Sequence, residues 1–325
     1  MTSHHAALVA VAALVLAAPG SHAGRNSALA SAEEIYNVRI LGARGNGKTN
    51  DTPAIRSVIK NAPDGAIIYF PPGNYRCHGL TVVDRERLTF RGAGPGSIIE
   101  APNTVRDPII LSLDQCRDIV FHDLTFDTGA TNVTALAISN CETVRIRDCK
   151  FTAAAPQQGA GVYLRNITNL WFTKNLIEQR HVEHQQLKRA RFSDNTFSGP
   201  SRFGIVMLAA AGSSCELLTI EDNIFDGMKN AAIGIWDPTS GSARIRDVKI
   251  RNNQIVCPTV TAMPPISIGQ VRGKPATESV WKNITIAGNS VHFTGPATTN
   301  HIIAVGGART KSSYSGFVIR DNDVT

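Results

Sequence analysis

Several side chains capable of acid–base chemistry stand close together in the middle of the chain. Tyr163 and Arg165 lie on one segment of alternating apolar residues, and His181, Glu183 and Gln185 lie on the next. A histidine, a carboxylate or a phenol can take up or release a proton during a reaction, and a guanidinium can hold a carboxylate through two hydrogen bonds. This set is competent to remove a proton from a carbon beside a carboxylate, as in elimination or epimerisation of a uronic acid.

The segments that carry these side chains belong to a repeat. The pattern apolar-x-apolar-x-x-Asn-x-apolar recurs along the chain, and periods of 20–50 residues are typical of coils stacked into a solenoid. Alternation with a step of two inside each copy predicts a strand. The marked asparagines are Asn175, Asn195, Asn223, Asn253, Asn289 and Asn322, and earlier copies carry Leu124 and Cys149 at this place.

A second short strand precedes each copy, so each coil supplies two or three strands that pair in parallel with the coils above and below, about 4.8 Å away. The amide of the recurrent asparagine can bond the backbone of its own turn and stack on the asparagine of the next coil. The sequence therefore predicts an all-β fold, a single-stranded right-handed parallel β-helix. Thr52 is expected to cap a short N-terminal helix that begins at Pro53 and closes the open end of the stack.

The alternation also predicts which side chains point outward from one parallel sheet. Its inward positions are Leu113, Ile138, Leu164, His184, Met207, Ile235 and Ile268. The residues beside them then form a face that is polar in the middle, with His181, Glu183, Arg165 and Tyr163 as candidate catalytic residues. Trp236, Asp237, Gln185 and Arg202 are candidate substrate-binding residues. Outward polar residues on a solvated sheet are common, however, and a shift of one residue would exchange the two faces.

The N-terminal region resembles that of a known superfamily. The run Gly42-Ala43-Arg44-Gly45-Asn46-Gly47, followed by Asp51-Thr52-Pro53-Ala54-Ile55, is similar to the entry motif of pectate-lyase-like β-helix proteins, and the run from Tyr69 to Tyr75 is similar to their next block. With the repeats, the resemblance covers roughly residues 36–325. It implies a β-helix whose outward side chains act on a polysaccharide, but it does not identify a reaction.

Three functional hypotheses follow. The first is a lyase or epimerase acting on an acidic polysaccharide. The second is a glycoside hydrolase of the same fold, which needs two carboxyl groups roughly 5–10 Å apart; Glu183 and Asp237, two coils apart, are the candidates. The third is a non-catalytic glycan-binding or surface protein. Motifs of polygalacturonase-type hydrolases are absent, and Thr239 stands where the Asp-Pro-His element of alginate epimerases would place histidine.

Composition and the N-terminal sequence indicate the class of protein and where in or outside the cell it works. The 325 residues are 42% hydrophobic, enough to bury a core, and the net charge of +7 includes no basic run of the kind that binds nucleic acid. Residues 6–18 are all Ala, Val or Leu and Ala23 ends a small-residue triplet, so residues 1–23 are expected to be a cleaved signal peptide. A linker over 24–35 and a β-helix domain over 36–325, with its N-terminal cap at about 36–75, then make up a secreted or periplasmic protein. No membrane-spanning segment is expected, and the protein is expected to be a monomer.

The cysteines and the possible metal ligands give little further indication of function. Cys116 and Cys141 fall at equivalent places of adjacent coils, so they are either two buried thiols or a disulfide. No acidic cluster for calcium and no zinc-like spacing is present, so no cofactor is predicted, although calcium stays open. The chain reaches Thr325 in the middle of a repeat with no obvious C-terminal cap, so two interpretations stay open: the sequence ends early, or the cap is very short.

Overall fold

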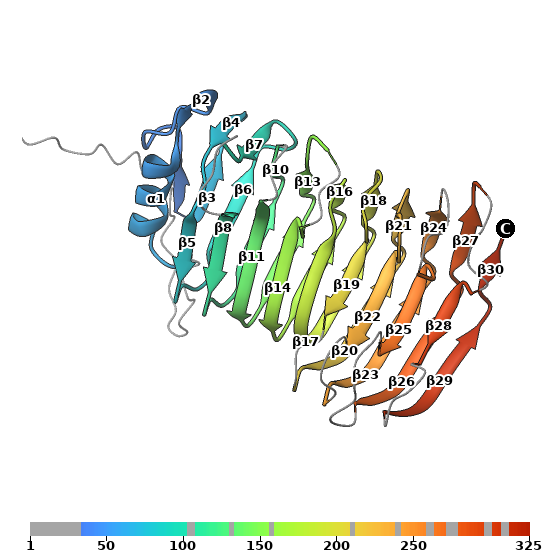
Figure 1. Ribbon diagram of the computed structural model, residues 1–325. Helices are drawn as coiled ribbons and strands as arrows, with labels where there is room; N and C mark the ends of the chain where they lie inside the picture. The colour runs from blue at the N-terminus through green and yellow to red at the C-terminus, as the bar shows by residue number, and fades with distance from the viewer. Residues whose placement is uncertain are drawn as a thin grey trace, which may run out of the picture. The chain divides into compact units, whose positions relative to one another are not determined.

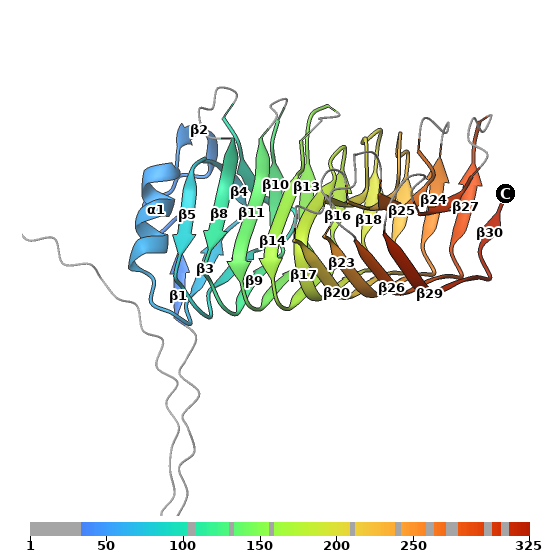
Figure 2. The same ribbon diagram turned by 60° about the horizontal axis from the view of Figure 1, so that its bottom comes forward.

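A computed structural model describes residues 34–102, 108–129, 133–155, 159–208, 212–237, 242–257, 263–270, 279–295, 301–306 and 312–325. The expected signal peptide lies outside these residues and stays a prediction. The described chain winds into coils stacked from α1 at one end to β30 at the other (Figures 1 and 2). Each coil contributes one strand in turn to three parallel sheets, here called A, B and C, with strand pairings that join equivalent residues of successive coils. The predicted parallel β-helix is confirmed.

The three sheets have the following strands. Sheet A contains β1 (Ile35–Asn37), β3 (Ile67–Phe70), β6 (Thr89–Gly92), β9 (Ile119–His122), β12 (Val144–Arg147), β15 (Leu170–Thr173), the second half of β17 (Val182–Ser193), β20 (Ser214–Glu221), β23 (Arg244–Arg251), β26 (Val280–Ala287) and β29 (Ser313–Arg320). Sheet B contains β2 (Asn46–Asn50), β4 (Gly73–Arg76), β7 (Ser97–Glu100), β10 (Thr125–Asp127), β13 (Lys150–Thr152), β16 (Leu176–Glu178), β18 (Thr196–Ser198), β21 (Ile224–Asp226), β24 (Gln254–Cys257), β27 (Ser290–Phe293) and β30 (Asp323–Val324). Sheet C contains β5 (Leu80–Val83), β8 (Ile109–Asp114), β11 (Thr134–Cys141), β14 (Val162–Ile167), the first half of β17, β19 (Ile205–Leu208), β22 (Ile233–Asp237), β25 (Ile266–Gln270) and β28 (Ile303–Val305).

The recurrent asparagines form a buried ladder at the turn from sheet A to sheet B. In Asn223, Nδ2 donates to Oδ1 of Asn253 at 2.9 Å, and Oδ1 accepts from Asn195 of the preceding coil. The residue before each asparagine has a left-handed backbone, such as Asp222 with φ of 54°. Short polar side chains tolerate this conformation best. The predicted role of the asparagines is confirmed.

The helix α1 (Thr52–Asn61) closes the N-terminal end of the core, with Ile55, Val58 and Ile59 buried against it. The cap itself differs from the prediction, because the N-cap residue is Asp51 and Thr52 is already helical. The Asp51 carboxylate accepts from the backbone N–H groups of Arg44 and Gly45. The entry motif thus folds its turn around Asp51, while Thr52 Oγ1 accepts from the His78 backbone at 3.2 Å.

The predicted inward row of sheet C is confirmed by the strand register. Leu113, Ile138, Leu164 and His184 are paired in sequence along the stack, and the row continues through Met207, Ile235 and Ile268. All are buried. Cys116 and Cys141 are buried free thiols. A hydrogen bond between them lowers the pKa of Cys116 to about 7.

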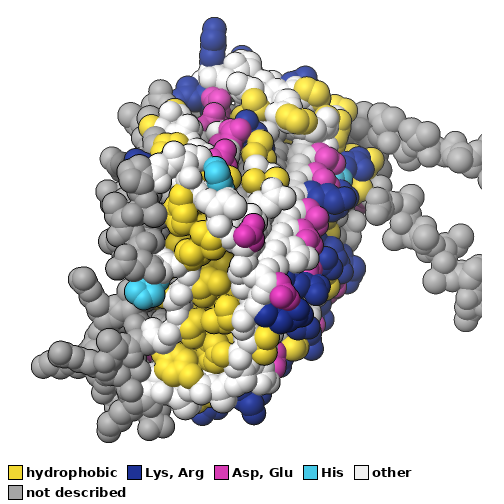
Figure 3. All heavy atoms as spheres, turned by 90° about the vertical axis from the view of Figure 1, so that its right-hand side faces the viewer, with side chains coloured by type: hydrophobic (Ala, Val, Ile, Leu, Met, Phe, Trp, Pro, Cys, Tyr) yellow, Lys and Arg dark blue, Asp and Glu magenta, His cyan; other side chains and the backbone are white. Residues whose placement is uncertain are grey.

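The core is exposed at the far end of the stack. Ile319 is 51% exposed, whereas Ile286 and Ile250, its equivalents in the two preceding coils, are fully buried. Figure 3 looks onto this end and shows a hydrophobic strip, with Lys and Arg side chains gathered along one side. Within the described residues, no helix is long and apolar enough to cross a membrane.

The outer face of sheet A is basic from β12 to β29. Its acidic strand residues are Glu216, Glu221 and Asp247. Its exposed cationic strand residues are Arg145, Arg147, Lys188, Arg189, Arg191, Arg244, Arg246, Lys249, Arg251, Lys282 and Arg320.

Candidate functional site

The polar patch predicted for the middle of sheet C forms on β14 and β17. Tyr163 lies opposite Glu183, and Arg165 lies opposite Gln185. Because adjacent strands are about 4.8 Å apart, these four side chains occupy one small area of the outer face. Small residues flank it toward the N-terminal coils, where Ala137 and Ser139 take the places of Tyr163 and Arg165.

Glu183 is the carboxylate at the centre of this patch. Its side chain is half-buried, and burial raises the pKa of Glu183 above its ordinary value. Among the described residues, no hydrogen bond or ion pair joins it to another group. A carboxylate without a neutralising partner and with a raised pKa is a stronger base than an exposed one.

Tyr163 and Arg165 complete the patch. Burial and the neighbouring charge of Glu183 raise the pKa of Tyr163, while Arg165 acts in the opposite direction. The phenol therefore keeps its proton at neutral pH. Arg165 is exposed, so its guanidinium is available to an anion in front of the sheet, with the half-buried Gln185 beside it.

His181 lies at the start of the same strand but is withdrawn from the surface. Only 3% of it is exposed, and the edge of its ring meets Phe203 at 5.8 Å between centroids. Burial, with the positive charges of Arg180 and Arg202, lowers the pKa of His181 to about 4. The imidazole is therefore neutral at pH 7 and covered, so it is not placed to exchange a proton with a substrate in front of the sheet. Arg202 is exposed, with its guanidinium 4.9 Å from the centre of the Phe203 ring.

Trp236 is also covered, contrary to its expected role as an exposed stacking surface. It is 3% exposed and belongs to an apolar cluster on the outside of sheet C with Phe203, Val206 and Ala231. Its Nε1 donates to Ser267 Oγ at 3.1 Å. Sequence alternation places Trp236 on the outer face correctly, but it cannot reveal that side chains from the turns lie over it.

Asp237 was expected in the outward patch and instead lies inside. It is fully buried, and its Oδ2 accepts a hydrogen bond from the buried Ser279 at the edge of sheet A. Glu183 and Asp237 therefore do not face a common sugar, and the carboxylate pair expected for hydrolysis is not formed by these two residues.

A different pair of carboxylates lies on sheet B. Glu100 and Asp127 are directly paired on adjacent coils, beside a hollow of about 240 Å³ lined also by Gly47, Arg76 and Gly129. Burial raises the pKa of Glu100, with Arg76 opposing and Asp127 reinforcing this shift. The pair was missed because the two residues are the last residues of separate short strands, and only the sheet B register joins them.

No group of three or more His, Cys, Asp or Glu side chains that could hold a metal ion occurs in the described part of the chain. The candidate patch on sheet C consists of Tyr163, Arg165, Glu183 and Gln185, hereafter the sheet C patch.

Comparison with known proteins identifies the family. Residues 35–268 match the model of the family described as rhamnogalacturonase A/epimerase, pectate lyase-like. The chain belongs to this family. Its fold is shared with an exopolygalacturonase from Thermotoga maritima, with a TM-score of 0.53 and 10% identity over 89% of this chain and 92% of that one.

Two further likenesses are partial or distant. Alginate lyase 7 of Azotobacter vinelandii is 32% identical over 111 residues, which are 30% of this chain and 13% of that protein. The chain thus matches only a small part of this relative. The Streptococcus pneumoniae surface protein and adhesin PfbA gives a TM-score of 0.49 at 14% identity, over 89% of this chain and 99% of that one.

Proposed function

We propose that the protein acts on a uronate-containing polysaccharide by abstracting a proton, as a lyase or an epimerase, at the sheet C patch. Membership of a family named for rhamnogalacturonase and epimerase activities supports a polysaccharide as the substrate, and the partial likeness to an alginate lyase supports an acidic one. We also propose that it works outside the cytoplasm, after cleavage near Ala23.

The observation that carries the proposal is the environment of Glu183. Its half-buried carboxyl has a raised pKa, lies opposite a protonated phenol on the next strand, and has an exposed guanidinium two residues beyond that phenol. Proton abstraction beside a carboxylate needs these three functions: a base, an acid and a cation.

The roles follow from this arrangement. Arg165 binds the uronate carboxylate and stabilises the negative charge that develops on it. Glu183 takes the proton from the adjacent ring carbon. In elimination, the electron pair of that C–H bond forms a C=C bond while the glycosidic C–O bond breaks, and Tyr163 gives its proton to the departing oxygen. In epimerisation, a proton returns to the opposite face and no C–O bond breaks.

Hydrolysis at Glu100 and Asp127 is a second candidate. Retaining glycosidases place two carboxyl groups about 5–5.5 Å apart, and this pair lies on adjacent strands beside a hollow. The carboxyl with the raised pKa, Glu100, would be the acid and Asp127 the nucleophile.

The test uses the protein and its Glu183→Gln variant on pectate, alginate, hyaluronan, chondroitin and neutral glycans, with and without calcium. Ultraviolet absorbance of unsaturated uronate, new reducing ends and exchange of ring hydrogen with deuterated water are followed together. We expect activity on one acidic polymer and a loss of about 10²–10⁴-fold in the variant. Glu142→Gln, an exposed acid paired with Arg117, is the matched control and should keep full activity.

The products separate the alternatives. Reducing ends without unsaturated sugar, lost in Glu100→Gln but kept in Glu183→Gln, would replace the proposal by hydrolysis on sheet B. Binding of one glycan without turnover would make the protein a recognition module and overturn the proposed chemistry.

A further inference from the structure

The basic outer face of sheet A carries a row of side chains that runs along the stack, perpendicular to the strands. The register joins Arg145, Trp171, Arg191, Thr219, Lys249 and Thr285 on successive coils. A cation thus recurs on every second coil, and a hydroxyl lies on each side of Lys249. This row is on a different sheet from Glu183.

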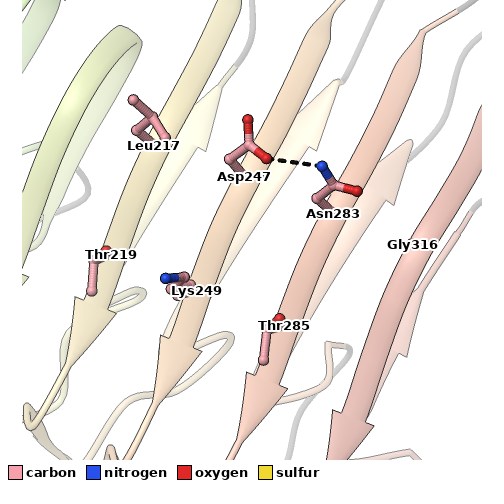
Figure 4. A pocket seen from close by; sticks show the side chains of 7 residues that line it. All are labelled: Leu217, Thr219, Asp247, Lys249, Asn283, Thr285 and Gly316. Atoms are coloured by element: carbon pink, nitrogen blue, oxygen red, sulfur yellow. Dashed lines mark hydrogen bonds between the residues drawn. The ribbon is translucent and has the colours of Figure 1, made fainter.

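A hollow of about 330 Å³ lies on this row. Thr219, Lys249 and Thr285 line it, with Leu217, Asp247, Asn283 and Gly316 along its other side (Figure 4). These last four are equivalent residues of four coils, and all have a left-handed backbone, with φ between 55° and 67°. The strands therefore bend at the same place on each coil, and the stacked bends form the hollow.

The charges at the hollow are of two kinds. Arg191 and Arg251 both pair with the buried carboxylate of Glu221, at 2.8 and 2.5 Å, so one of these two positive charges is offset within the protein. Lys249 and the neighbouring Lys282 are exposed, and no ion pair among the described residues joins either to an acid. Asp247 accepts from Asn283 Nδ2 at 2.9 Å, which leaves carboxylate and amide oxygens that can accept from sugar hydroxyls (Figure 4).

We infer that the outer face of sheet A is a second binding site, which holds an extended chain of an acidic polysaccharide along the stack. Each pyranose lengthens a polysaccharide by a distance close to the spacing between adjacent coils. In a chain whose sugars alternate in orientation, the carboxylates of every second sugar face the same side. Arg145, Arg191 and Lys249 have this spacing. Arg145 and Arg191 also pair with Asp118 and Glu221, so Lys249 is the cation of the row that meets a uronate carboxylate without a competing acid among the described residues. Threonine hydroxyls beside Lys249 add donors for the same carboxylate, and the exposed side chains of Leu217 and Trp171 offer apolar surface to sugar rings.

A polyuronate fits this face better than DNA. The sugar-phosphate backbone of DNA has no hydrogen-bond donor to meet Asp247, whereas each sugar of a polysaccharide carries hydroxyl groups. The inference goes beyond the proposed reaction, because binding here does not require turnover at the sheet C patch.

The test is equilibrium binding of polygalacturonate and alginate to the full-length protein and to a Lys249→Glu, Lys282→Glu double variant, at several salt concentrations. Dextran and single-stranded oligo-dT serve as neutral and nucleic-acid probes. We expect the double variant to bind the acidic polymers about tenfold or more weakly, with a shallower salt dependence because fewer counterions are released. Lys48→Glu, Lys60→Glu makes the same charge change on exposed residues outside sheet A and should stay within about twofold of the parent.

Equal loss of binding in both double variants would mean that net charge alone is responsible, and unchanged binding in the sheet A variant would place the polymer elsewhere. Either result overturns the inference, as does binding of oligo-dT with no binding of the polyuronates. Turnover of short acidic oligosaccharides, if the proposed reaction is correct, should be unchanged in the sheet A variant. Failure of the proposed reaction leaves the binding measurement interpretable, because that measurement needs no turnover.

Discussion

The outer faces of sheets C and A are built by the same coils, yet their charged side chains differ in burial and in pairing. On sheet C, Glu183 and Tyr163 are partly buried, their pKa values are raised, and no ion pair among the described residues neutralises the carboxylate. On sheet A, the cations are numerous and exposed, and several are paired with acids, as Arg246 is with Glu216 at 2.7 Å.

The difference shows what burial does to a charged side chain. Partial burial changes proton affinity, which suits a group that must gain or lose a proton. Full exposure makes each attraction weak and sensitive to salt, so many such contacts together suit the holding of a charged polymer. We therefore expect substitutions on sheet C to change turnover and substitutions on sheet A to change polymer binding.

Trp236 and Trp171 lie on the outer faces of sheets C and A, and their replacement by alanine should give the largest difference in the free energy of unfolding. Trp236→Ala on sheet C should lower the free energy of unfolding by about 3–5 kcal/mol, because it removes a buried ring and its bond to Ser267. Trp171→Ala on sheet A, where the ring is 39% exposed, should cost less than about 1 kcal/mol. Urea unfolding of both variants measures this. Equal small losses would restore Trp236 as an accessible sugar-stacking residue.

Much of the fold could be predicted because the same pattern of apolar residues and turns recurs in successive coils. Alternation of apolar residues gives the inward rows, and the asparagine at each turn fixes their register from coil to coil. His184 illustrates this. Although it is polar, the pattern predicts that it points inward because Leu164 and Met207 occupy the same row, and the structure confirms this position.

The environment of the outward side chains could not be predicted in the same way. Whether an outward residue is accessible depends on the turns between sheets, whose lengths and side chains do not repeat. Phe203 comes from such a turn and covers both His181 and Trp236. Asp237 is a different case, because the alternation that places Trp236 outward already places Asp237 inward, and its expected outward position was wrong. Only its partner Ser279, 42 residues away in sequence, could not be predicted.

Charge reversal tests the contrast in turnover. With a short acidic oligosaccharide as substrate, Arg165→Glu on sheet C should lower kcat/KM more than 100-fold, about 2.7 kcal/mol, because a carboxylate would then face the substrate carboxylate. Arg145→Glu on sheet A makes the same charge change and should alter kcat/KM less than about twofold. Similar losses in both variants would mean that the two faces do not differ in function.

Replacement of the buried His184 should change stability less than replacement of Trp236 does. It tests whether this residue of sheet C contributes to stability alone and not to turnover. Neither of its ring nitrogens has a hydrogen-bond partner among the described residues, and the ring stacks on Phe192 at 5.7 Å. His184→Leu removes two unsatisfied polar atoms from a row of apolar residues, so it should raise the free energy of unfolding by about 1–2 kcal/mol at pH 7 without changing turnover. Urea unfolding and the oligosaccharide assay measure the two quantities.

The same variant should change the pH dependence of stability. Burial lowers the pKa of His184 to about 3, from 6.5 when unfolded. Between these values the unfolded chain binds a proton that the folded protein does not, so stability falls as pH decreases from 6.5 toward 3. At pH 5 this loss is about 1–2 kcal/mol for His184, and the leucine variant should lack it while His181, with its pKa of about 4, still contributes. A leucine variant with the same slope as the parent would mean that His184 is protonated in the folded protein and has a partner there.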